Sequence, residues 1–282
     1  MSGEPRKVLW VLVPTRYLRT SPRSTQSVLL LMVRGLSKRL PRFQSAELLP
    51  EKDLQTIRKQ QEEKLQLQKT NSEVSLTRIS QRWKGQKVVV AAPGPSLGLL
   101  PPEIFEGHKI VAVNDAYRLI PSADVLYACD SKWWDCHQGC ADFKGEKWSS
   151  HNYDKKRIRD DKSRIQNTYG INLVSGTDGI GFSADPEVIH YGSNSGFQAL
   201  NLALLFGGDP IILVGFDMRV VEGKRHFFGD HPPGLSNTTT YQNFVAHFDR
   251  AMKKSPTAAK ILNATPGSAL TCFPMVDPYD VL

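Results

Sequence analysis

Six short runs rich in β-branched residues recur along the last two-thirds of the chain, and helical patterns separate several of them. Runs of this length fit buried strands, and the helical patterns fit the crossover connections of a parallel sheet. The sequence therefore predicts an α/β fold, a mostly parallel sheet with helices on both faces. The runs are Lys87–Ala92, Lys109–Val113, Asp124–Cys129, Ile171–Val174, Ile211–Phe216 and Lys260–Asn263.

Two of the expected helices have recognisable ends. The first runs from about Ser195 to Phe206, with Asn194 or Ser193 as its N-terminal cap and a pair of glycines as its stop signal. The second covers about 239–254, where apolar residues recur at the helical period and two lysines close the segment. Both fit amphipathic helices that pack on a sheet.

Net charge divides the chain in two. The chain has 36 Lys and Arg residues and 28 Asp and Glu residues, a formal charge of +8. Residues 1–87 hold 18 of the basic residues and 7 of the acidic ones, whereas residues 88–282 hold 18 and 21. This distribution excludes a reading of the whole chain as a basic nucleic-acid-binding domain. We expect a basic N-terminal segment over 1–86 and a catalytic domain over 87–282.

The basic segment has the composition of a targeting sequence or a basic arm. Between Pro5 and Ala46 it has nine Arg or Lys residues and no acidic one, as organelle transit peptides and nucleic-acid-binding arms do. Met32 is an alternative start of a shorter chain. Residues 51–70 are rich in Gln, Glu, Lys and Leu and predict a mostly exposed helix, either a spacer or a helix lying on the main domain.

The apolar runs and the cysteines bear on the compartment. The longest apolar runs, Val8–Val13 and Val28–Val33, are far shorter than the roughly 20 residues that span a bilayer, so no transmembrane helix is expected. The 4 cysteines are too few for a disulfide framework, which favours a cytoplasmic protein, with organelle targeting as the alternative. Cys136 and Cys140 flank His137, but no second pair follows at zinc-site spacing, and we expect ordinary thiols there.

The residues that follow each predicted strand are the candidates for function, because ligands of open parallel sheets bind beyond the carboxyl ends of the strands. Gly94-Pro95-Ser96 follows the first strand; the glycine permits close backbone approach, and the serine can donate to a phosphate or a ribose. Asn114 and Asp115 follow the second strand, where the amide can read a base or ribose edge. The alternatives are a plain Pro-Gly turn and a capped turn.

Two further polar segments follow predicted strands. Asp130 can bind ribose hydroxyls or a metal ion, or simply cap the next helix. Ser193, Asn194, Ser195 and Gly196 open the helix over 195–206, and hydroxyls with free N–H groups at a helix start form an anion site. An ordinary cap explains one of these polar residues and not the others, so we expect this segment to bind an anion.

The fifth segment joins a strand end to a histidine loop. Asp217 ends a predicted strand, and His226, Asp230 and His231 lie in a loop rich in Gly and Pro. Histidine titrates near neutrality and is the usual general base for a hydroxyl group. A metal site made of these four side chains is the alternative, although the loop contains no helical pair of ligands.

Taken in order, these five segments resemble the bacterial sialyltransferase family, whose members have a single-sheet, Rossmann-like (GT-A-type) fold. The resemblance extends to a wider group of motility-associated glycosyltransferases, phage proteins of unassigned role and archaeal pterin pyrophosphokinases. It covers roughly residues 87–275 and gives the N-terminal third no counterpart. The matching text lies at Gly94–Leu97, Asn114, Ser195–Met218, His226–His231 and Ile261–Ser268.

The resemblance implies an inverting glycosyltransferase that takes a nucleotide-activated sugar, typically CMP-linked, and requires no metal. The Gly-Pro-Ser loop, the strand-end asparagine and the Ser-Gly helix start would bind the donor. His231, with His226 in reserve, would be the general base on the acceptor hydroxyl. Those enzymes use tyrosines to steady the leaving phosphate; this chain has none at that position, so Arg219, Lys224 or Arg225 would neutralise the leaving nucleotide. This departure weighs against sialic acid as the sugar.

Two other functions stay open at this point. A pyrophosphokinase of the pterin type would transfer a pyrophosphoryl group from ATP, with Asp130 and Asp217 holding Mg²⁺. A structural or assembly protein would keep the nucleotide-binding fold without activity and bind nucleic acid or a partner through residues 1–86. A related alternative is an enzyme whose acceptor is nucleic acid, with the basic segment as its tether.

Overall fold

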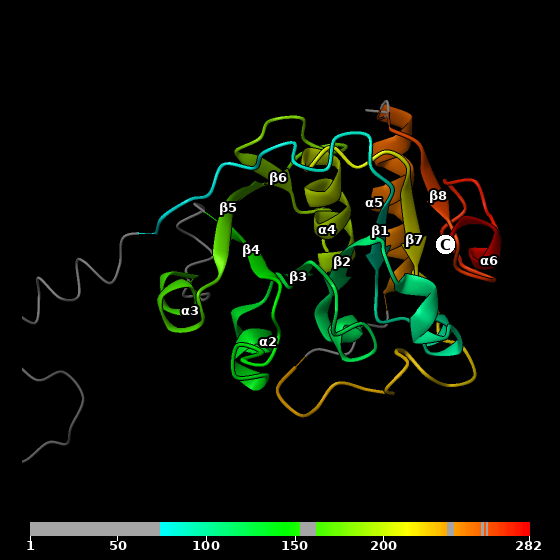
Figure 1. The fold of residues 1–282 in the computed structure, drawn as a ribbon, viewed down its shortest axis with the longest axis horizontal. Helices are drawn as coiled ribbons and strands as arrows, with labels where there is room; N and C mark the ends of the chain where they lie inside the picture. The colour runs from blue at the N-terminus through cyan, green and yellow to red at the C-terminus, as the bar shows by residue number, and fades with distance from the viewer. Residues whose placement is uncertain (1–73, 153–161, 236–239, 255–256, 258) are drawn as a thin grey trace, which may run out of the picture. The chain divides into compact units, whose positions relative to one another are not determined.

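The computed structural model describes residues 74–152, 162–235, 240–254, 257 and 259–282 (Figure 1). All of these belong to one compact unit, residues 58–282. The expectations for the basic segment, including the helix over 51–70, lie outside the described residues.

The described residues form an eight-stranded sheet in which every neighbouring pair of strands is parallel. The strand order is β6-β5-β4-β3-β2-β1-β7-β8. This confirms the predicted α/β fold of the Rossmann-like type. The strands are β1 (Val88–Ala91), β2 (Lys109–Val113), β3 (Val125–Tyr127), β4 (Glu146–Asn152), β5 (Asn172–Thr177), β6 (Val188–His190), β7 (Ile211–Val214) and β8 (Ile261–Asn263).

Residue patterns do not reveal two of these strands, β4 and β6. Strand β4 has the sequence EKWSSHN, and its Ser149 and Ser150 are buried. Their hydroxyls are satisfied across the fold, because Lys162 donates to Ser149 at 3.3 Å and Ser150 donates to Gln198 at 2.9 Å. Hydrogen bonds to distant residues thus replace the apolar burial that usually marks a central strand. Strand β6 has only three residues, too few to show a pattern.

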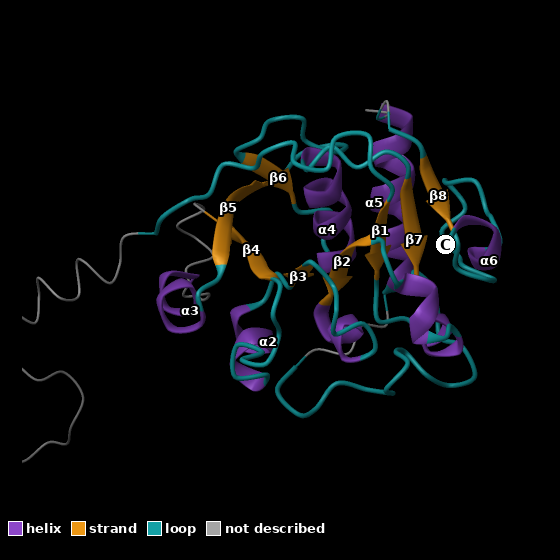
Figure 2. Cartoon of the chain, viewed as in Figure 1, coloured by secondary structure: helices purple, strands orange, loops and turns teal. Residues whose placement is uncertain are grey.

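Helices cover both faces of the sheet (Figure 2). Alternate residues of β1 point to opposite faces: Val88 and Val90 join one hydrophobic core, and Val89 and Ala91 join the other. The first core receives α4 and α5, and the second receives α2, α3 and the short 3-10 helices η1, η2 and η3. These are α2 (Ser131–Cys136), α3 (Lys162–Tyr169), α4 (Ser195–Leu205), α5 (Tyr241–Lys254), α6 (Pro278–Val281), η1 (Pro95–Leu99), η2 (Pro102–Phe105) and η3 (Asn114–Arg118).

Both helices expected from their ends are confirmed as α4 and α5, within two residues of the predicted bounds. Asn194 is the cap of α4, since its side chain accepts a hydrogen bond from the backbone N–H of Phe197 at 2.8 Å. No helix among the described residues is long and apolar enough to cross a membrane.

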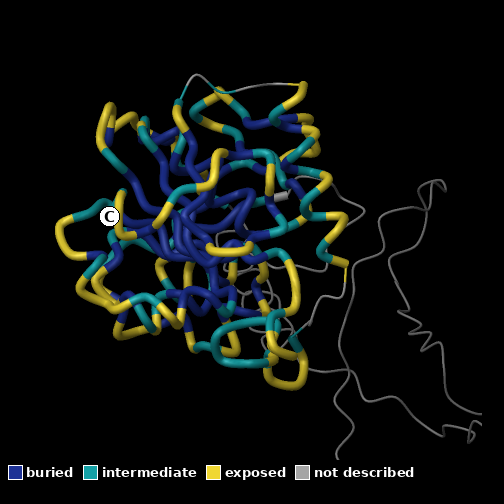
Figure 3. The backbone as a smooth tube through the Cα atoms, turned by 90° about the vertical axis from the view of Figure 1, so that its right-hand side faces the viewer, coloured by how far each residue is buried: buried dark blue, intermediate teal, exposed yellow. Residues whose placement is uncertain are grey.

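The segment before β1 also packs into the domain. Ile79 and Trp83 are buried in the first core, and Trp83 packs against Phe206 at the end of α4 with 4.6 Å between ring centroids. The buried segments gather in the interior of the domain, and the loops carry most of the exposed residues (Figure 3).

The strand order reverses beside β1. The chain builds the sheet outward from β1 to β6, then returns through α4 to place β7 on the other side of β1. At such a switch point the loops after the two adjacent strands diverge and open a crevice at the carboxyl edge. That edge holds the segments after β1, β2 and β7, which are three of the five candidate segments.

Candidate active site

The loops after β1, β2 and β7 meet at the carboxyl edge of the sheet. The backbone N–H of Phe227, in the loop after β7, donates to the carbonyl of Pro93 after β1 at 3.1 Å. His231, in the same loop, reaches Asp115 after β2. Residues separated by more than a hundred positions therefore form one site, as the sequence predicted for this edge.

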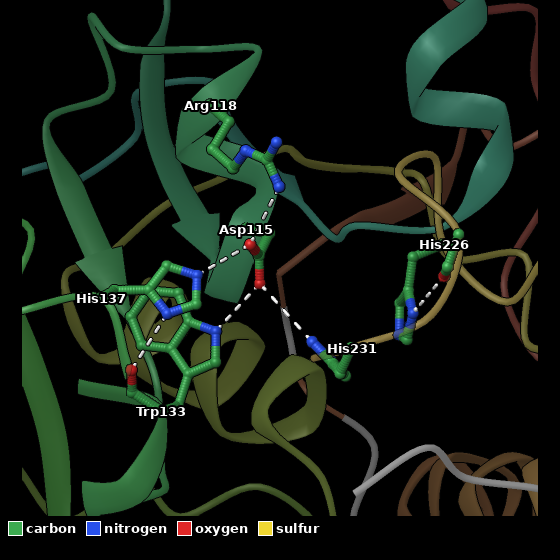
Figure 4. A network of polar contacts seen from close by, with 7 residues as sticks. Asp115, Arg118, Trp133, His137, His226 and His231 are labelled. Carbon is green, nitrogen blue, oxygen red and sulfur yellow. Dashed lines mark hydrogen bonds and ion pairs between the residues drawn. The ribbon is translucent and has the colours of Figure 1, made fainter. Parts of the chain in front are cut away.

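Asp115 is the centre of a buried polar network (Figure 4). Only 2% of the residue is exposed. Its Oδ1 lies 2.9 Å from Nε2 of His137 and 3.4 Å from Nη1 of Arg118. Its Oδ2 accepts a hydrogen bond from Nε1 of Trp133 at 2.9 Å and lies 3.9 Å from Nδ1 of His231. We call these five residues the Asp115 network.

His137 is a cation within this network. Its Nε2 faces the Asp115 carboxylate, and its Nδ1 lies 3.1 Å from the backbone carbonyl of Trp133. Both oxygens only accept hydrogen bonds, so both ring nitrogens must carry protons. Burial alone would lower the pKa of His137, but the hydrogen bond and the charge of Asp115 raise it above its ordinary value. The ring also stacks on the Trp133 indole, 4.2 Å between centroids.

The same contacts keep Asp115 ionised. Burial alone would raise the pKa of this carboxyl group, but hydrogen bonds from His137 and Trp133 bring it below its ordinary value. Because His137 already neutralises the carboxylate, the charge felt by His231 is that of an ion pair and not of a lone anion. The Asp115 carboxylate therefore raises the pKa of His231 less than a lone anion at the same place would.

His231 is held as a neutral base. Burial lowers the pKa of this ring, and the nearby Asp115 carboxylate offsets that effect only in part. Nδ1 lies 3.9 Å from the Asp115 carboxylate, beyond hydrogen-bond distance, and the negative charge there favours the tautomer with its proton on Nδ1 and a lone pair on Nε2. This is the form that a general base needs at neutral pH.

His226 lies beside His231 and is also neutral. The two ring centroids are 4.5 Å apart, and burial together with the neighbouring His231 ring, which disfavours a second proton in the pair, lowers the pKa of His226. Its Nδ1 lies 3.1 Å from the carbonyl of Gly229 and donates to it. Phe228 stacks on His226 at 5.0 Å with nearly parallel rings, and the Arg118 guanidinium lies 5.4 Å from the Phe228 centroid. This stack covers the two histidines.

Asp217 has a different environment, although it is as buried as Asp115, with 2% exposed. Its carboxylate accepts hydrogen bonds from the hydroxyl of Ser96 at 2.8 Å and from the backbone N–H of Ser96. Burial raises the pKa of Asp217, and the bonds from Ser96 offset this only in part. The predicted catalytic aspartate thus holds the loop after β1 in place.

Gly94 packs closely against the Asp217 carboxylate that holds this loop. A Cβ atom at this position would lie 2.1 Å from the Asp217 carboxylate and 2.3 Å from the Gly215 carbonyl. Its backbone N–H donates to the same carbonyl at 3.0 Å. The close approach predicted for Gly94 is therefore made to the protein itself, while Pro95 and Ser96 begin η1.

The start of α4 contacts the end of β3. The hydroxyl of Ser195 lies 3.0 Å from Sγ of Cys129 and accepts from the Cys129 backbone N–H at 3.2 Å. Asp130 follows at the cap position of α2, but its side chain makes no capping hydrogen bond there. Its charge is near enough to His231 to raise the pKa of that ring, so this cluster adjoins the Asp115 network.

Three residues at the carboxyl edge have left-handed backbone conformations, which side chains other than glycine seldom adopt. They are Asn114 after β2, with φ 48°, Ser193 before α4, with φ 63°, and Met218 after β7, with φ 51°. Such conformations persist where the surroundings fix them, and they gather at functional sites. Asn114 is half-buried at the carboxyl end of β2, and its role in donor binding stays a prediction.

The two arginines expected to neutralise a leaving group have partners of their own. Arg219 donates to the carbonyl of Gly267 at 2.7 Å, and Arg225 pairs with Asp230 at 2.8 Å. Both lie in the loop after β7 that carries the histidines. Among the described residues no group of three or more His, Cys, Asp or Glu side chains is arranged to hold a metal ion.

The sequence did not identify three members of the network, namely Arg118, Trp133 and His137. Trp133 and His137 are four apart, so they lie on one face at the end of α2, and this spacing was the available signal. Their common partner Asp115 is 22 residues before His137, on another element. Only the fold brings them together.

Comparisons of the chain with protein-family models, with curated proteins and with solved structures found no match.

Proposed function

We propose that the chain is an inverting glycosyltransferase that transfers a sugar from a nucleotide-activated donor to a hydroxyl acceptor, with His231 as the general base. The contact that carries the proposal is Asp115 Oδ2 to His231 Nδ1, 3.9 Å, at the carboxyl edge beside the switch point. The negative charge of a buried carboxylate on the Nδ1 side of a neutral imidazole favours the tautomer whose lone pair is on Nε2. Asp115 is the positioning residue, and His137 holds Asp115.

The chemistry follows from this arrangement. Nε2 of His231 takes the proton of the acceptor hydroxyl as its oxygen attacks the anomeric carbon of the donor. The bond between that carbon and the phosphate oxygen breaks, and its electron pair leaves with the nucleotide. Attack from the face opposite the leaving group inverts the anomeric configuration. Arg219 and Arg225 lie in the loop after β7, where a shift of either side chain from its present partner would meet the departing charge.

The donor is assigned to Asn114 after β2 and to the start of α4, because the polar groups of the segment after β1 are bonded to Asp217 and Gly215. The free backbone N–H groups of Ser195 and Gly196 at the start of α4 suit a phosphate. Asn114, in its left-handed conformation, suits a base or ribose edge. The CMP-linked nature of the donor is the expectation that the family resemblance adds.

Donor hydrolysis and transfer test this proposal, measured with a panel of nucleotide sugars by release of the nucleotide. We expect His231→Gln to lower turnover about 10²- to 10⁴-fold, the usual contribution of a general base, with an unchanged circular dichroism spectrum. His226→Gln tests the reserve assignment. His108→Gln is the matched control, because His108 precedes β2 at the opposite edge of the sheet and should leave turnover unchanged. Full activity in His231→Gln would overturn the assignment of the base.

Ligand-induced thermal shifts separate the other functions. Stabilisation by CMP or UMP without added metal supports a nucleotide-sugar donor. Stabilisation by ATP only with Mg²⁺ would favour the pyrophosphokinase, in which Asp130 and Asp217 hold the metal. Salt-sensitive DNA binding that disappears on deletion of residues 1–86, with no response to any nucleotide, would favour the assembly protein.

A further inference from the structure

A separate cavity of about 270 Å³ opens next to the carboxyl ends of β5 and β6, against α5. The loop after β5 supplies Asp178 and Ile180, and α5 supplies His247 and Arg250. Ser193, before α4, lies between them. None of these residues belongs to the Asp115 network.

Hydrogen-bond donors converge on this cavity from two elements. His247 and Arg250 are three apart on α5, so their side chains share one face of the helix. Ser193 has its left-handed backbone fixed at φ 63°, and its Oγ lies 3.0 Å from Nε2 of His247. Within the described part of the chain no carboxylate forms an ion pair with Arg250. The guanidinium is thus available to an anionic ligand.

The rest of the lining is backbone, the Asp178 carboxylate, the Ile180 side chain and the Phe197 ring. Gly179, Gly181 and Gly192 leave part of the wall without side chains. At Gly192 this is required, because φ is 49° and a Cβ atom would lie 2.0 Å from the Phe197 ring. Asp178 is exposed, forms no ion pair within the described ranges, and can only accept hydrogen bonds when ionised.

We propose that this cavity binds a small phosphorylated polyol, that is, a phosphate ester on a hydroxylated chain or single ring. The Arg250 guanidinium and the Ser193–His247 pair, whose Oγ and Nε2 share one hydrogen bond, offer donors from two elements, which suits the several oxygens of a phosphate better than the two of a planar carboxylate. Asp178 would repel a free phosphate but accept hydrogen bonds from the hydroxyls of a polyol. The volume lies near the lower end of the range for ligand pockets, which fits one ring and not a nucleotide sugar.

The proposal is independent of glycosyl transfer, because it is tested by binding. Isothermal titration calorimetry on the full chain uses glucose 6-phosphate, glucose, glucuronate and inorganic phosphate as probes. We expect glucose 6-phosphate to bind tightest and glucose not to bind. Arg250→Gln should weaken the binding of glucose 6-phosphate about 10-fold or more, as the loss of a charge-assisted hydrogen bond predicts.

Lys253→Gln is the matched control, because it removes one exposed positive charge from the same helix outside the cavity and should leave binding unchanged. Asp178→Asn should strengthen the binding of inorganic phosphate while it reduces the preference for glucose 6-phosphate over that ion. The proposal is wrong if Arg250→Gln and Lys253→Gln bind alike, if glucuronate binds as well as glucose 6-phosphate, or if no probe binds at about 10 mM, well above the millimolar affinity of a weak site.

Discussion

Asp115 and Asp217 are equally buried and follow neighbouring parts of the same sheet edge, yet their pKa values move in opposite directions. Asp115 follows β2 and has two histidines, an arginine and an indole around it, so its pKa falls. Asp217 follows β7 and has mainly Ser96 as its partner, so burial prevails and its pKa rises. Equal burial therefore gives an anion at one position and a more easily protonated carboxyl group at the other.

The difference shows that partners, and not burial, separate an aspartate suited to catalysis from one that holds a loop. Cationic partners keep Asp115 charged beside a base, where its charge and direction matter. Asp217 accepts hydrogen bonds from neutral donors of Ser96 and so holds the loop after β1 in place. The sequence marks both residues alike, since each simply follows a strand.

The largest expected effect is on stability at Asp115. Asp115→Ala leaves the His137 cation and the Trp133 N–H buried without their acceptor, and we expect a loss of about 3–5 kcal/mol in the free energy of unfolding. Asp217→Ala removes the acceptor of two neutral donors, the hydroxyl and the backbone N–H of Ser96. We expect that variant to lose about 1–3 kcal/mol in the free energy of unfolding. Urea unfolding measures both. Equal losses would mean that the Asp115 network is not an ion-pair network.

The next effect concerns the loop that Asp217 holds. In Gly94→Ala the new Cβ must displace the Asp217 carboxylate and the Gly215 carbonyl, which we expect to lower the free energy of unfolding by about 1–3 kcal/mol. Gly223→Ala is the comparison, because a Cβ there meets nothing within 4 Å and only the φ of 77° is strained. That variant should lose about 1 kcal/mol. If Gly94→Ala leaves the free energy of unfolding unchanged, the loop after β1 is not held tightly.

The smallest effect is a difference in pH dependence between two asparagine variants. The folded pKa of Asp115 lies below its ordinary value of 3.8, so its contribution to stability is full above that pH and is lost as pH falls through the folded pKa. The folded pKa of Asp217 lies above 3.8, so its contribution is full below that pH and is lost as pH rises through the folded pKa.

Relative to the wild type, Asp115→Asn should therefore become less destabilised as the pH is lowered from neutral toward 3. Asp217→Asn should instead gain relative stability as the pH is raised from 3 toward neutral. Urea unfolding at a series of pH values, with each variant compared with the wild type at the same pH, measures both slopes. Parallel slopes for the two variants would contradict the opposite shifts.

Local patterns were sufficient for most of the sheet and for the expectation that candidate residues gather at its carboxyl edge. Strands with apolar runs, such as β1 and β7, can be recognised from the sequence because they are buried on both faces. The polar strand β4 does not, since its serines depend on Lys162 and Gln198 from other elements. The rule that ligands bind at carboxyl ends directed attention to Asp115 and His231. It could not reveal that His137 pairs with Asp115, because that contact exists only after β2 and α2 pack together.

The aromatic cover of the histidine loop has a consequence for proton uptake. Burial lowers the pKa of His231. Phe228 contributes to this burial because its ring packs against both His231 and His226, and the Arg118 side chain lies over the Phe228 ring. A movement that lifted this loop from the sheet edge would expose the ring and return its pKa toward that of a free imidazole. His231 would then bind a proton below neutral pH when the loop is open and release it when the loop closes.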